Sequence, residues 1–206
     1  MTAWEKLQAG EQYNDFDPEL FQRRIAAKKL FRAYNRTEDE ETERRRELME
    51  QLFRSVGEDV WIEPDFRCEF GKNISIGDQV YINFGCIILD CAPVSIGSHC
   101  LLGPNIGIYP VNHAIDPEER AAGGCQGKPV HIGENVWLGG DGKITAGVTI
   151  GDNSIIGTGS VVTRDIPAGV IAVGNPCRVL RPITEKDKTE YLSRIRKDAS
   201  TNGAHC

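Results

Sequence analysis

The sequence IGENVWLGGDGKITAGVTIGDNSIIGTGSVV, residues 132–162, repeats a pattern of six residues. The aliphatic residues at every sixth position are Ile132, Leu138, Ile144, Ile150, Ile156 and Val162. Such a period fits neither an α-helix, with about 3.6 residues per turn, nor a flat strand, whose side chains alternate about every 2 residues. It is typical of a chain that forms a short strand, turns a corner and repeats. The pattern therefore predicts a mainly β protein built as a parallel β-helix.

The same frame starts near Val60 and extends to Val162 in three blocks, the first of which contains a two-residue slip after Cys68. Its earlier aliphatic or small apolar positions are Ile62, Cys68, Ile76, Ile82, Ile88, Ile96, Leu102 and Ile108. Glycine, asparagine and aspartate follow these positions, as in Gly151-Asp152-Asn153, and they tolerate the tight backbone of a corner. Cys86 and Cys100 fall on small inward positions, where reduced cysteine behaves as a small hydrophobe. We therefore expect three faces per turn and a core inside the coil.

One long segment, 110–129, does not fit the frame and must loop out of the coil. It carries Asn112-His113, Asp116-Pro117 and Gly123-Gly124. Long ordered loops on a rigid scaffold often carry functional residues. We therefore expect this segment to contribute to a functional site.

The chain divides into three parts. Residues 1–58 are predicted to form a helical segment, 59–181 the β-helix with its looped-out segment 110–129, and 182–206 a short C-terminal helix and tail. Thr2 with Glu5 and Thr37 with Glu40 match capping boxes, and Asp17-Pro18 matches an N-cap followed by proline. The C-terminal helix is predicted from Thr184, Tyr191, Leu192 and Ile195.

Composition excludes several classes of protein. The 206 residues carry a formal net charge of −6, which argues against a general nucleic-acid binder. The seven cysteines contain no Cys-x-x-Cys pair, so neither a zinc site nor a disulfide framework is expected. There is no apolar run of about 18 residues and no signal-peptide pattern, so we expect a cytoplasmic protein without a membrane partner.

Three segments, together with the repeat, resemble one family. They are Ala9-Gly10-Glu11-Gln12-Tyr13-Asn14-Asp15, the Asn112-His113 loop, and Val173-Gly174-Asn175-Pro176-Cys177-Arg178-Val179-Leu180-Arg181. The chain resembles the hexapeptide-repeat sugar O-acetyltransferases of the maltose, galactoside and nodulation acetyltransferase family, and the maltose type most closely. The resemblance extends to about residue 197. It implies a left-handed coil, an N-terminal cap of the maltose acetyltransferase type, and a homotrimer with active sites between subunits.

The resemblance also implies a reaction. Acetyl-CoA, as co-substrate, gives its acetyl group to a hydroxyl of a sugar such as maltose or glucose, by direct attack in a ternary complex. His113 matches the family's catalytic histidine. A sugar hydroxyl is a weak nucleophile, and a general base that removes its proton is typically worth about 10²–10⁴ in rate. Asn83 matches the residue that helps to stabilise the oxyanion.

Binding residues are likewise implied by matching positions. For the sugar acceptor they are Asp15, Glu69, Tyr81 and Asn83, whose polar groups suit neighbouring hydroxyls. For acetyl-CoA they are Gly140, Thr158, Thr163, Arg164, Arg178 and Arg181. Glycine allows close approach of the extended pantetheine arm, and arginine binds phosphates. No metal is expected.

Two departures from the family and two alternative functions remain. Cys91 stands where the galactoside type has a second acid. Gly142 occupies an inward position normally filled by a small side chain, and Lys143 an outward position that is usually apolar, so we expect a looser coil there. One alternative is a non-catalytic trimeric sugar-binding scaffold. The other is a γ-type zinc carbonic anhydrase-like hydratase, although the loop breaks the regular spacing of His99, His113 and His131.

Overall fold

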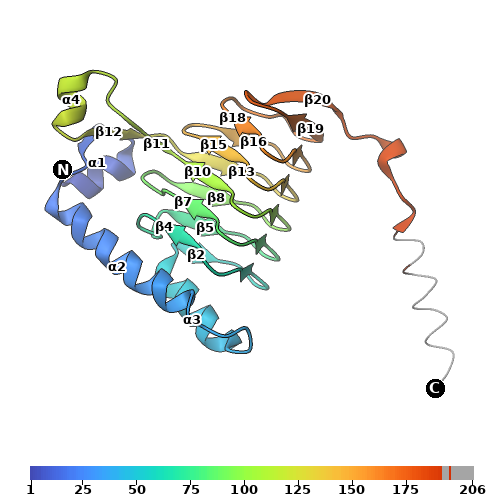
Figure 1. Ribbon diagram of the computed structural model, residues 1–206, viewed down its shortest axis with the longest axis horizontal. Coiled ribbons are helices and arrows are strands. Elements are labelled where there is room, and N and C mark those ends of the chain that lie inside the picture. Colours follow the sequence, from blue (N-terminus) through green and yellow to red (C-terminus); the bar gives the residue numbers. More distant parts are fainter. Residues whose placement is uncertain (192–194, 196–206) are drawn as a thin grey trace.

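Very short strands, most of two or three residues, stack into three parallel faces around a common core (Figure 1). The computed structural model describes residues 1–191 and 195. Its main body is a β-solenoid of about six turns. The first five turns contribute one strand to each face, as the six-residue period predicts, and the last turn adds β19 (Val170–Val173) to one face.

The strands of the three faces are as follows. The first face contains β2 (Ser55–Val56), β5 (Ile74–Ile76), β8 (Val94–Ile96), β13 (Val130–Ile132) and β16 (Thr149–Ile150). The second contains β3 (Trp61–Ile62), β6 (Tyr81–Ile82), β9 (Leu101–Leu102), β14 (Trp137–Leu138), β17 (Ile155–Ile156) and β19 (Val170–Val173). The third contains β4 (Arg67–Cys68), β7 (Ile87–Ile88), β10 (Gly107–Tyr109), β15 (Lys143–Thr145) and β18 (Val161–Val162).

The aliphatic series forms the core of the coil. All six members from Ile132 to Val162 are at most 2% exposed, and equivalent residues pair in register on successive turns, as Leu102 does with Leu138. Cys86 and Cys100 are buried at the predicted inward positions. At the corners, Asn135 and Asn153 have φ of 53° and 58°, the left-handed backbone that asparagine tolerates. The fold prediction is confirmed.

The coil begins with β2 at Ser55, inside the segment predicted to be helical. Before it lie α1 (Ala3–Ala9), α2 (Pro18–Tyr34) and α3 (Thr42–Leu52). Phe31 and Tyr34 of α2 and Met49 and Leu52 of α3 belong to the same hydrophobic core as the first turns of the coil. The two helices therefore cover the start of the solenoid, where an open edge would otherwise invite pairing with another chain.

Two of the predicted helix starts are confirmed and one is wrong. The Thr2–Glu5 capping box is present, and Asp17 caps α2 with Pro18 in its first turn. The predicted Thr37–Glu40 box does not form, because α3 begins later, at Thr42. The Thr37 hydroxyl instead donates to the carbonyl of Tyr34, at 2.7 Å. It therefore satisfies the end of α2 rather than the start of α3.

The looped-out segment is an antiparallel hairpin, residues 111–127. It consists of β11 (Val111–His113), α4 (Pro117–Ala121) and β12 (Gly124–Gly127). β12 also pairs with β1 (Tyr13–Asn14), so the hairpin is attached to the N-terminal segment beside α1 (Figure 1). This three-stranded sheet stands apart from the three faces of the coil.

After β19 the chain turns back as β20 (Arg178–Pro182) and then extends away from the coil (Figure 1). A 3-10 turn, Glu185–Asp187, follows, with Thr184 and Asp187 forming a capping box. Most of the predicted C-terminal helix, with Leu192, and the tail lie outside the described residues. In the described part of the chain, no helix is long and apolar enough to cross a membrane.

Candidate active site

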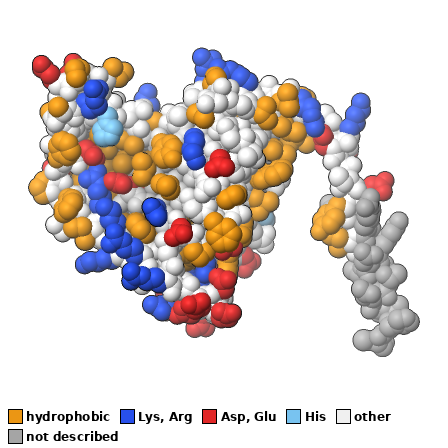
Figure 2. All heavy atoms as spheres, viewed as in Figure 1, with side chains coloured by type: hydrophobic (Ala, Val, Ile, Leu, Met, Phe, Trp, Pro, Cys, Tyr) orange, Lys and Arg blue, Asp and Glu red, His pale blue; other side chains and the backbone are white. Residues whose placement is uncertain are grey.

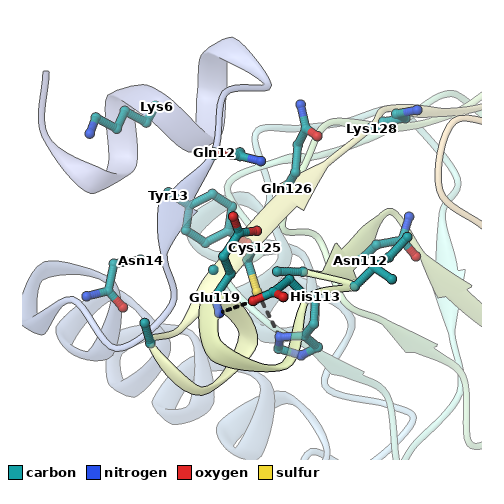
Figure 3. Close-up of a pocket in the computed structure, with 15 residues that line it drawn as sticks. Lys6, Gln12, Tyr13, Asn14, Asn112, His113, Glu119, Cys125, Gln126 and Lys128 are labelled. Atoms are coloured by element: carbon teal, nitrogen blue, oxygen red, sulfur yellow. Dashed lines mark hydrogen bonds between the residues drawn. The ribbon is translucent and has the colours of Figure 1, made fainter.

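His113 ends β11 and faces Cys125 of β12 across the hairpin. The imidazole Nδ1 and the Cys125 Sγ are 3.0 Å apart (Figure 3). The histidine is exposed, whereas Cys125 is only 3% exposed. Burial raises the pKa of the Cys125 thiol to about 11, so the thiol is neutral at physiological pH. The ring thus has one nitrogen held against a buried thiol.

A cleft of about 660 Å³ opens beside His113. Its lining comes from β1, both hairpin strands and α4, with Lys6 contributed by α1 (Figure 3). Tyr13 pairs with Cys125, and Cys125 with His113, so the three residues form one row across the small sheet. Tyr13 and Cys125 pack into a separate small core with Leu7 and Phe70. This core makes the hairpin a firm support for the histidine.

Asp15 and Glu69, two of the residues predicted to bind the sugar acceptor, both contact one arginine. The Arg24 guanidinium forms ion pairs with both carboxylates and donates to the Asp15 carbonyl, at 2.9 Å. The Asp15 N–H in turn donates to the Gly123 carbonyl of the hairpin, at 2.8 Å. The predicted pair is therefore brought together close to the segment that carries His113.

The sequence alone did not single out Arg24. Lysines and arginines lie along the exposed surface of α2 (Figure 2). Charged residues in a helix usually face solvent, so they do not by themselves indicate a site. Arg24, however, shares a helix face with the buried Leu20, Ala27 and Phe31, at helical spacing. An arginine on the buried face of a helix needs partners for its charge, so its position in the sequence pattern could have identified Arg24 as a paired residue.

The corner that carries Glu69 is shaped by Asp90. This carboxylate is fully buried and accepts hydrogen bonds from the backbone N–H groups of Glu69, Phe70 and Asn73, at 3.0, 2.8 and 3.2 Å. Burial raises the pKa of Asp90 to about 6, despite these bonds. Asp90 has no contact with the cleft and acts on Glu69 through the backbone.

Tyr81 and Asn83, the other predicted acceptor residues, lie elsewhere. The Tyr81 hydroxyl donates to Glu63, at 2.7 Å, and this bond raises the pKa of Tyr81 to about 12. Asn83 follows β6, and its Oδ1 accepts from the Phe84 N–H, at 2.8 Å. Within one chain, the structure does not bring either residue to His113.

Two edges of the coil separate the predicted residues. The Asn83 edge lies between the second and third faces and also carries Gly140 and Thr158, on neighbouring turns. The His113 edge lies between the third and first faces and carries Glu69, Thr163 and Arg164, besides the hairpin. The third face lies between the two edges.

The predicted arginines differ in their partners. Arg164 is exposed and has no ion-pair partner within residues 1–191 and 195. Arg178 donates to the Cys177 carbonyl, at 2.7 Å. Arg181 is held by both carboxylate oxygens of Asp187, at 2.7 and 2.9 Å, and this pair lowers the pKa of Asp187. Arg164 is thus the least engaged of the three predicted arginines.

The remaining described histidines lie apart from His113. His99 stands at a corner with φ of 63°, and the His131 Nδ1 is 2.8 Å from the Ser95 hydroxyl on the first face. Among the residues with described positions, no three His, Cys, Asp or Glu side chains are grouped so that they could hold a metal ion.

Known proteins resemble both parts of the chain. The maltose acetyltransferase hexapeptide capping motif matches residues 6–57. A hexapeptide repeat of succinyl-transferase matches residues 93–112 and 129–164. The galactoside O-acetyltransferase of Escherichia coli (strain K12) is 40% identical over 200 residues, which cover 97% of this chain and 98% of that protein. Nodulation protein L of Rhizobium meliloti is 46% identical over 178 residues, covering 86% and 97%.

Solved structures agree with this similarity. A maltose O-acetyltransferase from Clostridium difficile 630 has 46% identity and a TM-score of 0.87, covering 90% of this chain and 99% of that one. A galactoside acetyltransferase in complex with coenzyme A has 41% identity and a TM-score of 0.87, covering 93% and 96%. The chain therefore belongs to the hexapeptide-repeat sugar O-acetyltransferases of the maltose and galactoside acetyltransferase family.

Proposed function

We propose that this enzyme transfers the acetyl group of acetyl-CoA to a hydroxyl of a sugar such as maltose or glucose, with His113 as the general base. The observation that carries the proposal is the setting of His113. Its Nδ1 is held by Cys125, while Nε2 has no partner among the described residues and the ring borders the cleft. Such a ring can accept a proton from a substrate hydroxyl.

The acceptor sugar is bound by Asp15 and Glu69, together with Arg24. Each carboxylate uses one oxygen on Arg24, so the other oxygen can accept a bond from a sugar hydroxyl. Arg24 also offsets the repulsion between the two charges. Because a carboxylate left without its hydroxyl is penalised, this cluster discriminates between sugars.

Acetyl-CoA is bound by the second group of residues. A galactoside acetyltransferase with a similar fold has been solved with coenzyme A, and a Vibrio cholerae hexapeptide-repeat acetyltransferase with acetyl coenzyme A. Gly140 and Thr158 offer a narrow corner to the pantetheine arm, and Arg164 and Arg178 offer cations to the phosphates. Arg181 is paired with Asp187, so it is less available to a phosphate.

The reaction runs in one ternary complex. The sugar oxygen attacks the thioester carbonyl while His113 Nε2 takes the hydroxyl proton. The Asn83 amide, whose N–H groups have no partner among the described residues, stabilises the oxyanion. The C–S bond then breaks, and His113 returns the proton to the departing thiolate.

A homotrimer with active sites between subunits completes this arrangement. His113 and Asn83 lie on different edges of one chain, so a neighbouring subunit must supply the second residue. The outward positions of the second face support such packing, because they form an apolar row in which Leu101 and Trp137 are 51% and 52% exposed. The row is Trp61, Tyr81, Leu101, Trp137, Ile155 and Ile171.

The test is release of free CoA thiol from acetyl-CoA, with and without maltose, glucose or a β-galactoside. We expect sugar-dependent release by the wild type and a loss of at least about 100-fold in His113→Ala, the lower end of the range for a general base. His99→Ala, which removes another exposed histidine, serves as the control and should keep its activity. Binding of acetyl-CoA without release for any sugar would favour the non-catalytic scaffold.

A further inference from the structure

The partner of His113 is a neutral thiol. Cys125 lies directly opposite His113 in the hairpin register, with Sγ 3.0 Å from Nδ1 (Figure 3). Cys125 is in turn paired with Tyr13 on its other side and packed in the small core with Leu20 and Cys91. Two antiparallel ladders therefore fix the position of the sulfur, and the sulfur is the ring's one polar side-chain contact among the described residues.

The proton between sulfur and nitrogen decides what the ring can do. If the S–H donates to Nδ1, the neutral ring carries its proton on Nε2, and Nε2 cannot act as a base. If Nδ1–H donates to the sulfur, Nε2 is unprotonated and faces the substrate. The hydrogen bond at one ring nitrogen thus sets the state of the other.

We propose that Cys125 is a positioning residue for His113, in which the thiol sulfur accepts a hydrogen bond from Nδ1–H and keeps Nε2 free as the base. During turnover Nε2 gains the acceptor's proton, and the Nδ1–H···Sγ bond holds the imidazolium ring. No proton passes to the sulfur. The role in turnover rests on the proposed function, but the contact and its effect on the tautomer do not.

A neutral partner differs in kind from a charged one. An adjacent carboxylate would attract the imidazolium and favour the protonated ring. Burial raises the pKa of the Cys125 thiol, so the thiol stays neutral. Its sulfur therefore orients the imidazole ring without adding a negative charge. Other charged side chains surround the His113–Cys125 pair, and they belong to all the segments packed against it. They are Lys6, Asp15, Arg24, Asp116, Glu119 and Lys128. These groups are the same in the wild type and in every Cys125 and Cys91 variant.

The first test observes the ring directly. In protein labelled with ¹⁵N-histidine, NMR distinguishes the two neutral tautomers, and His113→Gln assigns the signal. We expect the Nδ1–H tautomer in the wild type and in Cys125→Ser, and a shift toward Nε2–H in Cys125→Ala. Cys125→Asp adds an opposite charge beside the ring and should favour its protonated form, in contrast to the neutral thiol.

The second test is the pH profile of kcat/KM. Cys125→Ala should lower kcat/KM about tenfold, the effect of losing about one hydrogen bond, and Cys125→Ser should recover most of it. In Cys125→Asp the acidic limb should move to higher pH. Cys91→Ala is the matched control, since Cys91 is a buried thiol of the same small core with no contact to His113. It should leave tautomer and profile unchanged.

Two results would overturn the proposal. One is an Nε2–H tautomer in the wild type, and the other is a Cys125→Ala spectrum that matches the wild type or changes no more than that of Cys91→Ala. Should Cys125→Asp fail to fold, the alanine and serine variants still decide. If His113→Ala retains sugar acetylation, the general-base assignment fails, while the NMR comparison still reports on the Cys125 contact.

Discussion

Gly142 shows how a single missing side chain can be compensated inside the coil. It is a buried residue immediately before β15, one position before Lys143, which pairs with Gly107 of the preceding turn. A Cβ on Gly142 would lie 3.1 Å from Ile106 Cδ1. The position expected to be empty is therefore filled by the larger residue below it. The backbone ladder also continues on both sides, from Gly107 N–H to the Gly142 carbonyl (2.9 Å) and from Lys143 N–H to the Ser160 carbonyl (2.8 Å).

This contact predicts a coupled pair. Gly142→Ala should lower the free energy of unfolding by about 1 kcal/mol, because Ile106 has to move aside in a close-packed core. Ile106→Val removes the Cδ1 atom and should cost about 1 kcal/mol alone. The double variant should be more stable than the sum of the two losses predicts, as measured by urea unfolding. Strict additivity would show that the two side chains do not share the space.

At the scale of elements, the corner between β4 and β5 depends on one buried acid. Asp90 binds three backbone N–H groups of this corner, including that of Glu69. Buried carboxylates that hold a loop in this way are sensitive to pH, because burial disfavours the charged form. Glu69, which we propose binds the sugar acceptor, thus lies on a corner whose stability is linked to the protonation of Asp90.

The direction of the pH effect follows from the pKa of Asp90. The value rises from 3.8 in the unfolded chain to about 6 in the fold, so the folded state binds the proton more tightly. Asp90's contribution is therefore fully present below about pH 4 and is lost as pH rises through about 6. The free energy of unfolding of the wild type, relative to Asp90→Asn, should fall by up to about 3 kcal/mol across this window. Urea unfolding at several pH values checks this, and a constant difference would contradict it.

Elements whose structure follows from a local sequence pattern could be predicted. Features that depend on residues distant in the sequence could not. The series from Ile132 predicted the coil because each inward side chain meets its equivalent on the next turn. The failed Thr37 cap depended on where α2 ends. Arg24 escaped notice because its partners lie 9 and 45 residues away. The role of Cys125 depends on the hairpin register, which a sequence pattern does not specify.

At the scale of the whole molecule, the separation of His113 and Asn83 on two edges of the coil explains why the proposed site needs a second subunit. The His113 edge and the Asn83 edge flank the third face, so a single chain separates the proposed base from the proposed oxyanion donor. The apolar row on the second face, with Leu101 and Trp137 half exposed, resembles the core of a subunit interface more than a solvated surface. Packing around a three-fold axis would repeat the same contact at each of the three boundaries.

This arrangement predicts that two inactive variants restore each other. His113→Ala and Asn83→Ala should each be nearly inactive alone. If a site takes His113 from one subunit and Asn83 from its neighbour, every mixed trimer, whether 2:1 or 1:2, keeps both residues intact at one of its three sites. Co-expression of differently tagged chains, isolation of mixed trimers and measurement of sugar-dependent CoA release test this. Mixing the two purified trimers without subunit exchange is the control and should stay inactive. Mixed trimers without activity would mean that both residues act within one chain, whereas about one third of wild-type activity requires a site shared between subunits.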